Sequence, residues 1–325
     1  MIVSRLGNAL RNSAKPSFST IRFFTFLTYP VSLGVMLLEK SGMLFFLARF
    51  TAPLMDFLGL PGETALVCFT SIFLNVYSAI AVMETLNLSG RDIIILTTFC
   101  LIAHNFFIEN AVLKKAGSPL FRITFHRLFF AIATAWILNL ILPAEGASRI
   151  VDAMPLSPAA ASAPLALMPE IGLDVTELPS LLLSWFISSS MLILRVSLII
   201  LAVVFLQKLM DEFGLMKFFG RLSSPLMRVL GLSANAGYVW VVANVIGLLY
   251  GSAALVEEAR NGTLSPREVK LFNNHVAISH SQMEDTFLFM ALGAPALWVA
   301  LPRFIVAIIV VWLERGCRFL FRKLF

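Results

Sequence analysis

Long apolar runs are the feature that most limits what this chain can become. Four stretches reach or approach the roughly 20 residues that an α-helix needs to cross a bilayer, and they cover 23–38, 121–142, 181–206 and 297–313. Only 14% of the residues are charged, whereas a soluble domain carries about 25%. We therefore expect an all-α polytopic membrane protein whose main partner is the lipid bilayer, and not a soluble enzyme with an anchor.

The charged and sulfur-containing residues exclude several other classes. Residues 1–20 are basic and lead into an apolar run with no small-residue cleavage site, so we expect an uncleaved first helix. The net charge of +6 does not indicate nucleic acid, because Lys and Arg mark cytoplasmic loops in membrane proteins. The three cysteines, Cys68, Cys100 and Cys317, are scattered and lack disulfide or redox spacing.

The two halves of the chain repeat one another. His104 and Glu109 correspond to His280 and Asp285 at an offset of 176 residues. The same offset joins Ser89 to Ser265, Arg91 to Arg267, Gly117 to Gly293, Pro119 to Pro295 and Arg127 to Arg303, while Gly59 and Leu60 match Gly231 and Leu232 at an offset of 172. Ser89 with Asp92, and Ser265 with Glu268, also have the spacing of a capping box at a helix start.

These matches divide the chain into segments. We expect a basic N-terminal segment at 1–20, a first repeat at 21–142, an acidic external linker at 143–179, a second repeat at 180–316 and a basic tail at 317–325. Each repeat has five parts: an apolar helix (22–40, 180–206), an amphipathic helix (42–58, 208–230), an interrupted apolar segment (62–86, 234–258), a capped helix with a polar second half (90–114, 266–291) and a final apolar helix (118–142, 295–316).

The basic clusters orient the two repeats. If all of them lie in the cytoplasm with both termini, each repeat crosses the inner membrane an odd number of times, and consecutive repeats then have opposite orientations. Because each repeat has four apolar segments, one must enter and leave on the same side. We expect this in the third segment, as a re-entrant helical hairpin that is buried in protein or lines a cavity. The alternative is eight ordinary spans, with parallel repeats and a linker on the internal side.

The capped helices carry most of the ionisable residues that lie within apolar sequence. A carboxylate at the bilayer centre costs about 2.5–3.5 kcal/mol on insertion scales, so such groups must face protein or water. The candidate site residues in these helices are His104, Asn105, Glu109, Asn110, His280, Ser281, Gln282, Glu284 and Asp285. Spacings of i and i+4 place Asn105 with Glu109, His280 with Glu284, and Ser281 with Asp285 on shared helix faces.

Two interpretations of this polar set stay open. The first is a binding site where the repeats meet, in which carboxylates bind a proton, Na+ or a polar solute and the histidines relay protons. The second is a polar clamp that holds helices together. For the polar residues of the hairpins, hydrogen bonding to a solute and helix packing are equally good interpretations, and these residues are Asn75, Ser78, Asn244, Tyr250 and Ser252.

Several residues are assigned no role in binding. We expect Arg127 and Arg303 to extend toward the lipid headgroups. His275 and His280 are five residues apart, which does not keep them on one helix face, so we assign no metal ligands. The sequence contains no HExxH, GxSxG or phosphate-loop motif, and we expect no enzymatic activity and no resident cofactor.

Four motifs resemble a known family. They are Gly59-Leu-Pro-Gly-Glu63, Asn75-Val-Tyr-Ser78, His104-Asn105 with Glu109, and Lys114-Lys115-Ala-Gly-Ser118. Together they resemble the bacterial nucleoside recognition, or Gate-domain, membrane proteins over most of both halves. The chain is more distantly similar to concentrative nucleoside transporters, the ferrous-iron transporter membrane domain and spore maturation membrane proteins. The resemblance implies inverted repeats with helical hairpins, and the domain's name implies nucleosides.

The sequence therefore predicts a secondary transporter, coupled to protons or Na+, for a small polar solute such as a nucleoside. Two alternatives stay open: a metal-ion or other ion permease, and a non-transporting assembly or regulatory membrane protein. The sequence also leaves open whether the chain forms a homo-oligomer.

Overall fold

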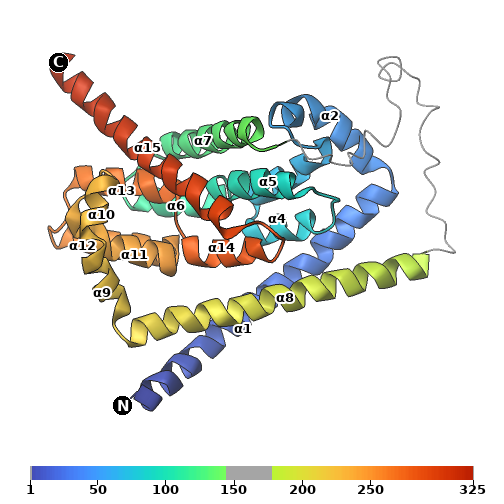
Figure 1. Ribbon diagram of the computed structural model, residues 1–325, viewed down its shortest axis with the longest axis horizontal. Coiled ribbons are helices and arrows are strands. Elements are labelled where there is room, and N and C mark those ends of the chain that lie inside the picture. Colours follow the sequence, from blue (N-terminus) through green and yellow to red (C-terminus); the bar gives the residue numbers. More distant parts are fainter. Residues whose placement is uncertain (1, 144–177, 325) are drawn as a thin grey trace.

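The computed structural model describes residues 2–143 and 178–324, and every regular element in them is a helix (Figure 1). The first half contains α1 (Ile2–Lys40), α2 (Met43–Phe57), η1 (Gly62–Thr64), α3 (Ala65–Phe73), α4 (Val76–Met83), α5 (Gly90–Ile102), α6 (Phe106–Lys115) and α7 (Leu120–Ile141). The second half contains α8 (Leu178–Glu212), α9 (Leu215–Leu222), α10 (Ser224–Val229), η4 (Ala234–Ala236), α11 (Gly237–Val245), α12 (Leu248–Arg260), α13 (Pro266–Ile278), α14 (Gln282–Met290) and α15 (Ala296–Leu324). The all-helical class is confirmed.

The order of helices is the same in both halves. The helix α1 corresponds to α8, α2 to α9 with α10, and each later element to its counterpart through α7 and α15. Even the backbone irregularities match, since Asn105 and Ser281 have φ of 48° and 50°, and Gly117 and Gly293 have φ of 94° and 91°. Both predicted capping boxes are formed. The linker expected at 143–179 lies almost entirely outside the described residues.

The first helices of the two halves lie side by side and run in opposite directions. Near the start of α1, Asn8 donates to Glu212 at the end of α8, over 3.1 Å. Toward the end of α1, the hydroxyls of Ser32 and Ser189 are 3.0 Å apart, and Ser189 lies early in α8. Figure 1 shows this antiparallel crossing, with α1 in blue and α8 in yellow-green. Equivalent helices that point in opposite directions are the arrangement expected of inverted repeats.

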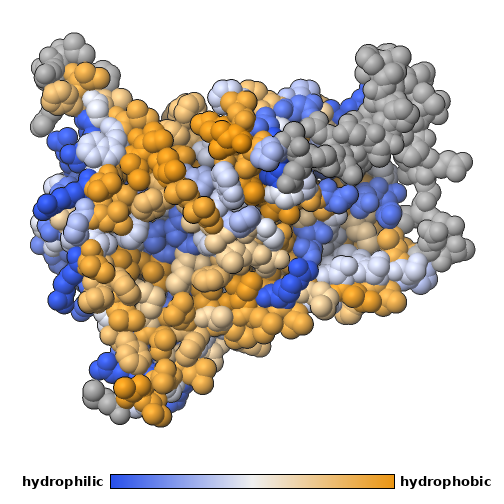
Figure 2. Space-filling model, in the orientation of Figure 1, coloured by the Kyte–Doolittle hydropathy of each residue, from blue (hydrophilic) through white to orange (hydrophobic). Residues whose placement is uncertain are grey.

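Five helical segments of the described chain are long and apolar enough to cross a bilayer. They are 2–40, 90–115, 120–141, 178–212 and 296–320, and a sixth arises if α2 and the η1–α3 pair, which meet at 92°, form one broken span. Large apolar side chains such as Phe26, Phe121 and Leu183 are exposed on these helices. Figure 2 shows the resulting apolar surface across much of the visible face, and in a bilayer such a surface faces lipid.

The third segment of each repeat is split into two short helices. The split falls at residues 74–75 in the first repeat and at 246–247 in the second. In the second repeat, a Cβ added to Gly251 would lie 2.5 Å from the Cβ of Ala243. Ala243 lies three residues before the split and Gly251 four residues after it, so α12 folds back closely onto α11. The expected helical hairpin therefore exists in the second repeat.

The fourth segment of each repeat differs from the prediction. The sequence indicates one continuous helix at 90–114 and another at 266–291, but each breaks near its middle. The breaks lie at 103–105 and 279–281, where Asn105 and Ser281 take left-handed backbone conformations. Neither break contains glycine or proline, the usual local signals for interrupting a helix. Each break places the end of one helix and the start of the next at the centre of the protein.

Candidate functional site

A cavity of about 330 Å³ lies where the two repeats meet. Its wall includes the first residues of four helices, two from each repeat: α4, α6, α12 and α14. The first N–H groups of a helix have no partner within the helix. At α6, α12 and α14 the N-cap residues Asn105, Gly247 and Ser281 supply no side-chain cap. The cavity therefore meets several helix starts whose N–H groups are suited to polar acceptors on a ligand.

The two broken helices are held by the same contacts in both repeats. The N–H of Asn105 donates to the carbonyl oxygen of Ser71 over 2.9 Å, and the N–H of Ser281 donates to that of Ala243 over 2.9 Å. Each bond ties the break to the first arm of the hairpin in the same repeat. Because a buried backbone group without a partner is costly, these bonds let the helices unwind inside the protein.

Two buried arginines bind the carbonyl groups on the other side of the breaks. Arg127 donates from Nη2 to the carbonyl oxygen of His104 over 2.8 Å, and Arg303 donates from Nη2 to that of His280 over 2.6 Å. Both side chains are fully buried. Each also pairs with the carboxylate of its own repeat, Arg127 with Glu109 at 2.7 Å and Arg303 with Asp285 at 3.0 Å. The expectation that these arginines extend toward lipid headgroups is wrong, because the carbonyl groups and carboxylates offset the cost of burying the guanidinium.

The arginines differ in how completely they are bonded. Arg127 also donates from Nε to the carbonyl oxygen of Ile102 over 2.9 Å and from Nη1 to Oδ1 of Asn110 over 3.1 Å. Nε and Nη1 of Arg303 have no hydrogen-bond partner among the described residues. At the offset of 176, the counterpart of Asn110 is Thr286, whose side chain is shorter. The second repeat therefore holds its arginine with fewer bonds than the first.

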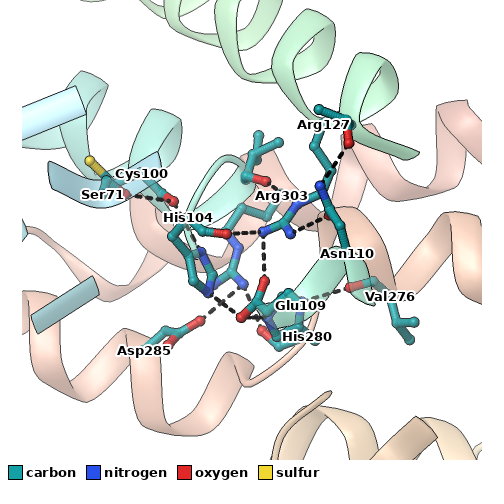
Figure 3. A network of polar contacts seen from close by, with 12 residues as sticks. Ser71, Cys100, His104, Glu109, Asn110, Arg127, Val276, His280, Asp285 and Arg303 are labelled. Carbon is teal, nitrogen blue, oxygen red and sulfur yellow. Dashed lines mark hydrogen bonds and ion pairs between the residues drawn. The ribbon is translucent and has the colours of Figure 1, made fainter. Parts of the chain in front are cut away.

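The two histidines converge on one carboxylate (Figure 3). Their rings lie 5.2 Å apart between centroids, and Nε2 of His104 and Nε2 of His280 are 2.9 and 3.3 Å from Oε1 of Glu109. The opposite ring nitrogens contact backbone carbonyls, with Nδ1 of His104 3.1 Å from the oxygen of Cys100 and Nδ1 of His280 2.6 Å from that of Val276. The cluster therefore joins residues of α6, both helix breaks and both repeats.

The break also changes the predicted pairing of polar side chains. His280 lies within the break and Glu284 follows it, so the two do not share a helical face as the i,i+4 spacing suggested. His280 instead faces Glu109 of the other repeat. Glu284 accepts a hydrogen bond from the hydroxyl of Tyr77 over 2.7 Å, again across the repeats. Sequence spacing holds for a continuous helix and fails where the helix is interrupted.

The structure brings eight of the predicted site residues to the cavity wall: Asn75, His104, Asn105, Glu109, Tyr250, Ser281, Glu284 and Asp285. Six others lie outside the lining: Ser78, Asn110, Asn244, Ser252, Gln282 and His280. His280 still contacts Glu109, and Asn110 binds Arg127. Among the rest, Ser78 is bonded to Asn75, Asn244 to the carbonyl of Trp240 and Gln282 to Ser279.

Sequence reasoning missed four residues that shape this site: Tyr77, Arg127, Gly247 and Arg303. Arg127 and Arg303 were matched by the repeat offset, which was the available signal for a shared role. Gly247 has φ of 118°, which favours glycine, and it begins α12 at the cavity. Tyr77 has no matched counterpart, because Leu249 occupies the position at the hairpin offset of 172.

Comparisons with known proteins agree with a membrane protein. The chain is 26% identical over 281 residues to a Bacillus subtilis (strain 168) protein named "Uncharacterized membrane protein YvoD", and the match covers 86% of each chain. No family model matches the chain. No solved structure matches it.

Proposed function

We propose that this protein is a secondary transporter for a small polar solute, which binds in the cavity between the two repeats. The observation that carries the proposal is the cavity itself, whose wall is built from matching helix breaks of both repeats. Broken helices that meet near the midplane at a repeat interface are the usual construction of solute sites in secondary transporters.

The chemistry of the wall supports a polar, uncharged or weakly charged ligand. The uncapped helix starts offer N–H donors, and the side-chain amide nitrogen of Asn75 and the hydroxyl of Ser281 add hydrogen-bonding capacity. The partly buried carboxylate of Glu109 and the buried carboxylate of Asp285 are each paired with an arginine. A third carboxylate on the wall, that of Glu284, accepts a hydrogen bond from Tyr77. The site therefore presents hydrogen-bonding groups together with carboxylates, which suits a nucleoside-sized polar molecule of the kind that the family resemblance names.

The arrangement of the repeats supports movement of such a solute. Contacts that cross the site join Glu109 to His280 and Tyr77 to Glu284. These are side-chain contacts, which can break and re-form when one repeat rocks against the other. In inverted-repeat transporters, that motion exposes a fixed site to alternate sides. In the proposed orientation both termini are in the cytoplasm and the protein lies in the inner membrane, with a proton or Na+ driving uptake.

The test begins with a ligand screen on purified protein. Nucleosides, nucleobases and other small polar solutes are added in turn, and the melting temperature reports binding. A solute that stabilises the protein is then measured for uptake into proteoliposomes under a proton or Na+ gradient. We expect saturable uptake by the wild type.

Two carboxylate variants locate the site. Glu109→Gln and Asp285→Asn keep side-chain size and are expected to reduce uptake at least tenfold while the protein still folds. Glu212→Gln is the matched control, because Glu212 lies at the end of α8 and contacts Asn8 rather than the cavity. Normal uptake by both cavity variants would refute the proposed site, and the absence of flux for every stabilising solute would favour a non-transporting role.

A further inference from the structure

While both imidazoles are neutral, the direct contacts of His104, Glu109 and His280 leave their hydrogen-bonding groups unsatisfied. A backbone carbonyl oxygen only accepts hydrogen bonds, so Nδ1 of each histidine carries the hydrogen in its contact with Cys100 or Val276. In a neutral imidazole the other nitrogen, Nε2, is then a bare acceptor. Yet both Nε2 atoms face the same carboxylate oxygen, at 2.9 and 3.3 Å. Three acceptors that converge in this way call for positive charge between them, which either protons on the imidazoles or a bound cation supplies.

The surroundings of the cluster match those of metal ligands. A histidine that binds a metal almost always donates its other ring nitrogen to a carbonyl or carboxylate, and a metal-binding carboxylate is itself hydrogen-bonded. Both histidines donate to backbone carbonyls, and the second oxygen of Glu109 accepts from Arg127 over 2.7 Å. Every member of the cluster is therefore oriented by a partner that leaves its metal-facing atom free to bind.

The spacing of the three ligand atoms also fits. They all lie within 4.8 Å of one another. Ligands about 2.0–2.2 Å from a Zn²⁺ ion in tetrahedral geometry are separated by roughly 3.3 Å, close to the two measured separations from Glu109. The two histidine ligand atoms are at most 4.8 Å apart, so the rings need to approach one another by up to about 1.5 Å to complete the triangle. The neighbouring cavity, lined by His104 and Glu109, leaves room for water or a solute at the remaining positions.

We infer that His104, His280 and Glu109 bind a divalent first-row transition-metal cation of the Zn²⁺ or Fe²⁺ class. Two imidazoles and one carboxylate are a common ligand set for these ions, whereas Mg²⁺ and Ca²⁺ prefer oxygen ligands. The inference rests on the proposed function in one respect, because it places this cation beside the cavity where the solute is proposed to bind. Because His104 and His280 belong to different repeats, the bound ion bridges the two bodies whose relative movement transport requires.

The experiment measures metal binding directly. Purified protein, stripped with a chelator and kept in detergent, is titrated with Zn²⁺ by equilibrium dialysis, and with Co²⁺ as a probe whose visible absorption reports nitrogen and oxygen ligands. We expect one saturable site per chain. Removal of a partner that merely orients a ligand typically weakens metal binding 10- to 100-fold, so we expect His104→Gln and His280→Gln each to weaken it by about 100-fold or more.

The chain offers matched controls, since it contains only four histidines. His126→Gln removes a histidine from α7 outside the cluster, and His275→Gln removes a buried one that accepts a hydrogen bond from Trp240. Both are expected to bind Zn²⁺ as the wild type does. If the cluster variants fail to fold, X-ray absorption of Zn²⁺ bound to the wild type decides the question, because two imidazoles must appear in the first coordination shell.

The outcomes separate this inference from the proposed function. No saturable Zn²⁺ or Co²⁺ binding, or binding unchanged in both cluster variants, overturns the metal site, even if solute uptake is normal. A metal site without uptake of any solute supports the site and refutes the proposed transport of polar solutes. Uptake of ⁶⁵Zn²⁺ into proteoliposomes identifies the ion as cargo, whereas metal-dependent uptake of a solute without ⁶⁵Zn²⁺ accumulation identifies it as a bound bridging ion.

Discussion

Replacement of Arg127 by methionine tests whether the buried arginines hold the broken helices together. Arg127 makes four hydrogen bonds, to the carbonyl oxygens of Ile102 and His104 and to the side chains of Glu109 and Asn110. Methionine fills much of the same space but donates no hydrogen bond. The variant therefore leaves two backbone carbonyls and one carboxylate with fewer partners in a fully buried position.

The size of the effect follows from these bonds. Removing one partner of a buried ion pair costs about 3–5 kcal/mol, and a buried acceptor left without a partner costs roughly 1–3 kcal/mol. Glu109 keeps its contact with His104 at 2.9 Å, so the terms do not add in full. We expect Arg127→Met to lower the free energy of unfolding by about 3–6 kcal/mol. Arg303→Met is expected to cost roughly 2 kcal/mol less, because Arg303 lacks the bonds that Arg127 makes from Nε and Nη1.

The measurement is reversible unfolding in mixed micelles, or the melting temperature in detergent where unfolding is irreversible. Arg267→Met is the matched control, since Arg267 is exposed at the start of α13 and its replacement should change stability by less than about 0.5 kcal/mol. The predicted order of stability is wild type and Arg267→Met, then Arg303→Met, then Arg127→Met. The reasoning fails if Arg127→Met is as stable as Arg267→Met.

Two further predictions concern the backbone. Gly251→Ala is expected to lower stability by about 1–3 kcal/mol because its new Cβ would lie 2.5 Å from that of Ala243. Gly34→Ala is the control: its new Cβ meets open space, so the change should raise stability by up to about 1 kcal/mol. Equal melting temperatures for the two variants would contradict the tight hairpin. Ser281→Val is expected to lose about 1–2 kcal/mol through its positive φ, while Ser281→Gly is tolerated. A Ser281→Val variant as stable as Ser281→Gly would show that the break is not left-handed.

The helical class and the helix starts of each half could be predicted because they depend on local chemistry. The capping boxes at Ser89 and Ser265 each depend on only four consecutive residues, and both are formed. The all-helical class followed from apolar runs. The offset that joined His104 to His280 and Glu109 to Asp285 also selected four residues that the structure brings to one centre.

The helix breaks could not be predicted because their cause lies elsewhere in the chain. Nothing around Asn105 signals an interruption, and the break is stabilised by Ser71 on one side and Arg127 on the other. For the same reason the arginines were assigned to the surface. A lone arginine in an apolar helix extends to the headgroups, and only a carboxylate and unwound carbonyls from other segments make its burial favourable.

The domain boundaries, the orientation in the membrane and the coupling ion remain predictions. The sequence favours cytoplasmic termini through its basic clusters. The antiparallel α1 and α8 agree with opposed repeats. Which repeat faces which compartment is a matter for topology mapping with reporter fusions, which should place both termini on the cytoplasmic side.

The most direct test of the central claim is protection of a cavity position by solute. Leu249 is 60% exposed and lines the cavity, whereas Leu222 is 63% exposed on α9 and lies outside it. Each is changed to cysteine in a Cys317→Ser background, because Cys317 is the exposed cysteine of the chain, and labelled with a water-soluble thiol reagent in membranes. A saturating solute from the screen should slow labelling of Leu249→Cys at least fivefold and leave Leu222→Cys unchanged. Unchanged labelling of Leu249→Cys would contradict a solute site between the repeats.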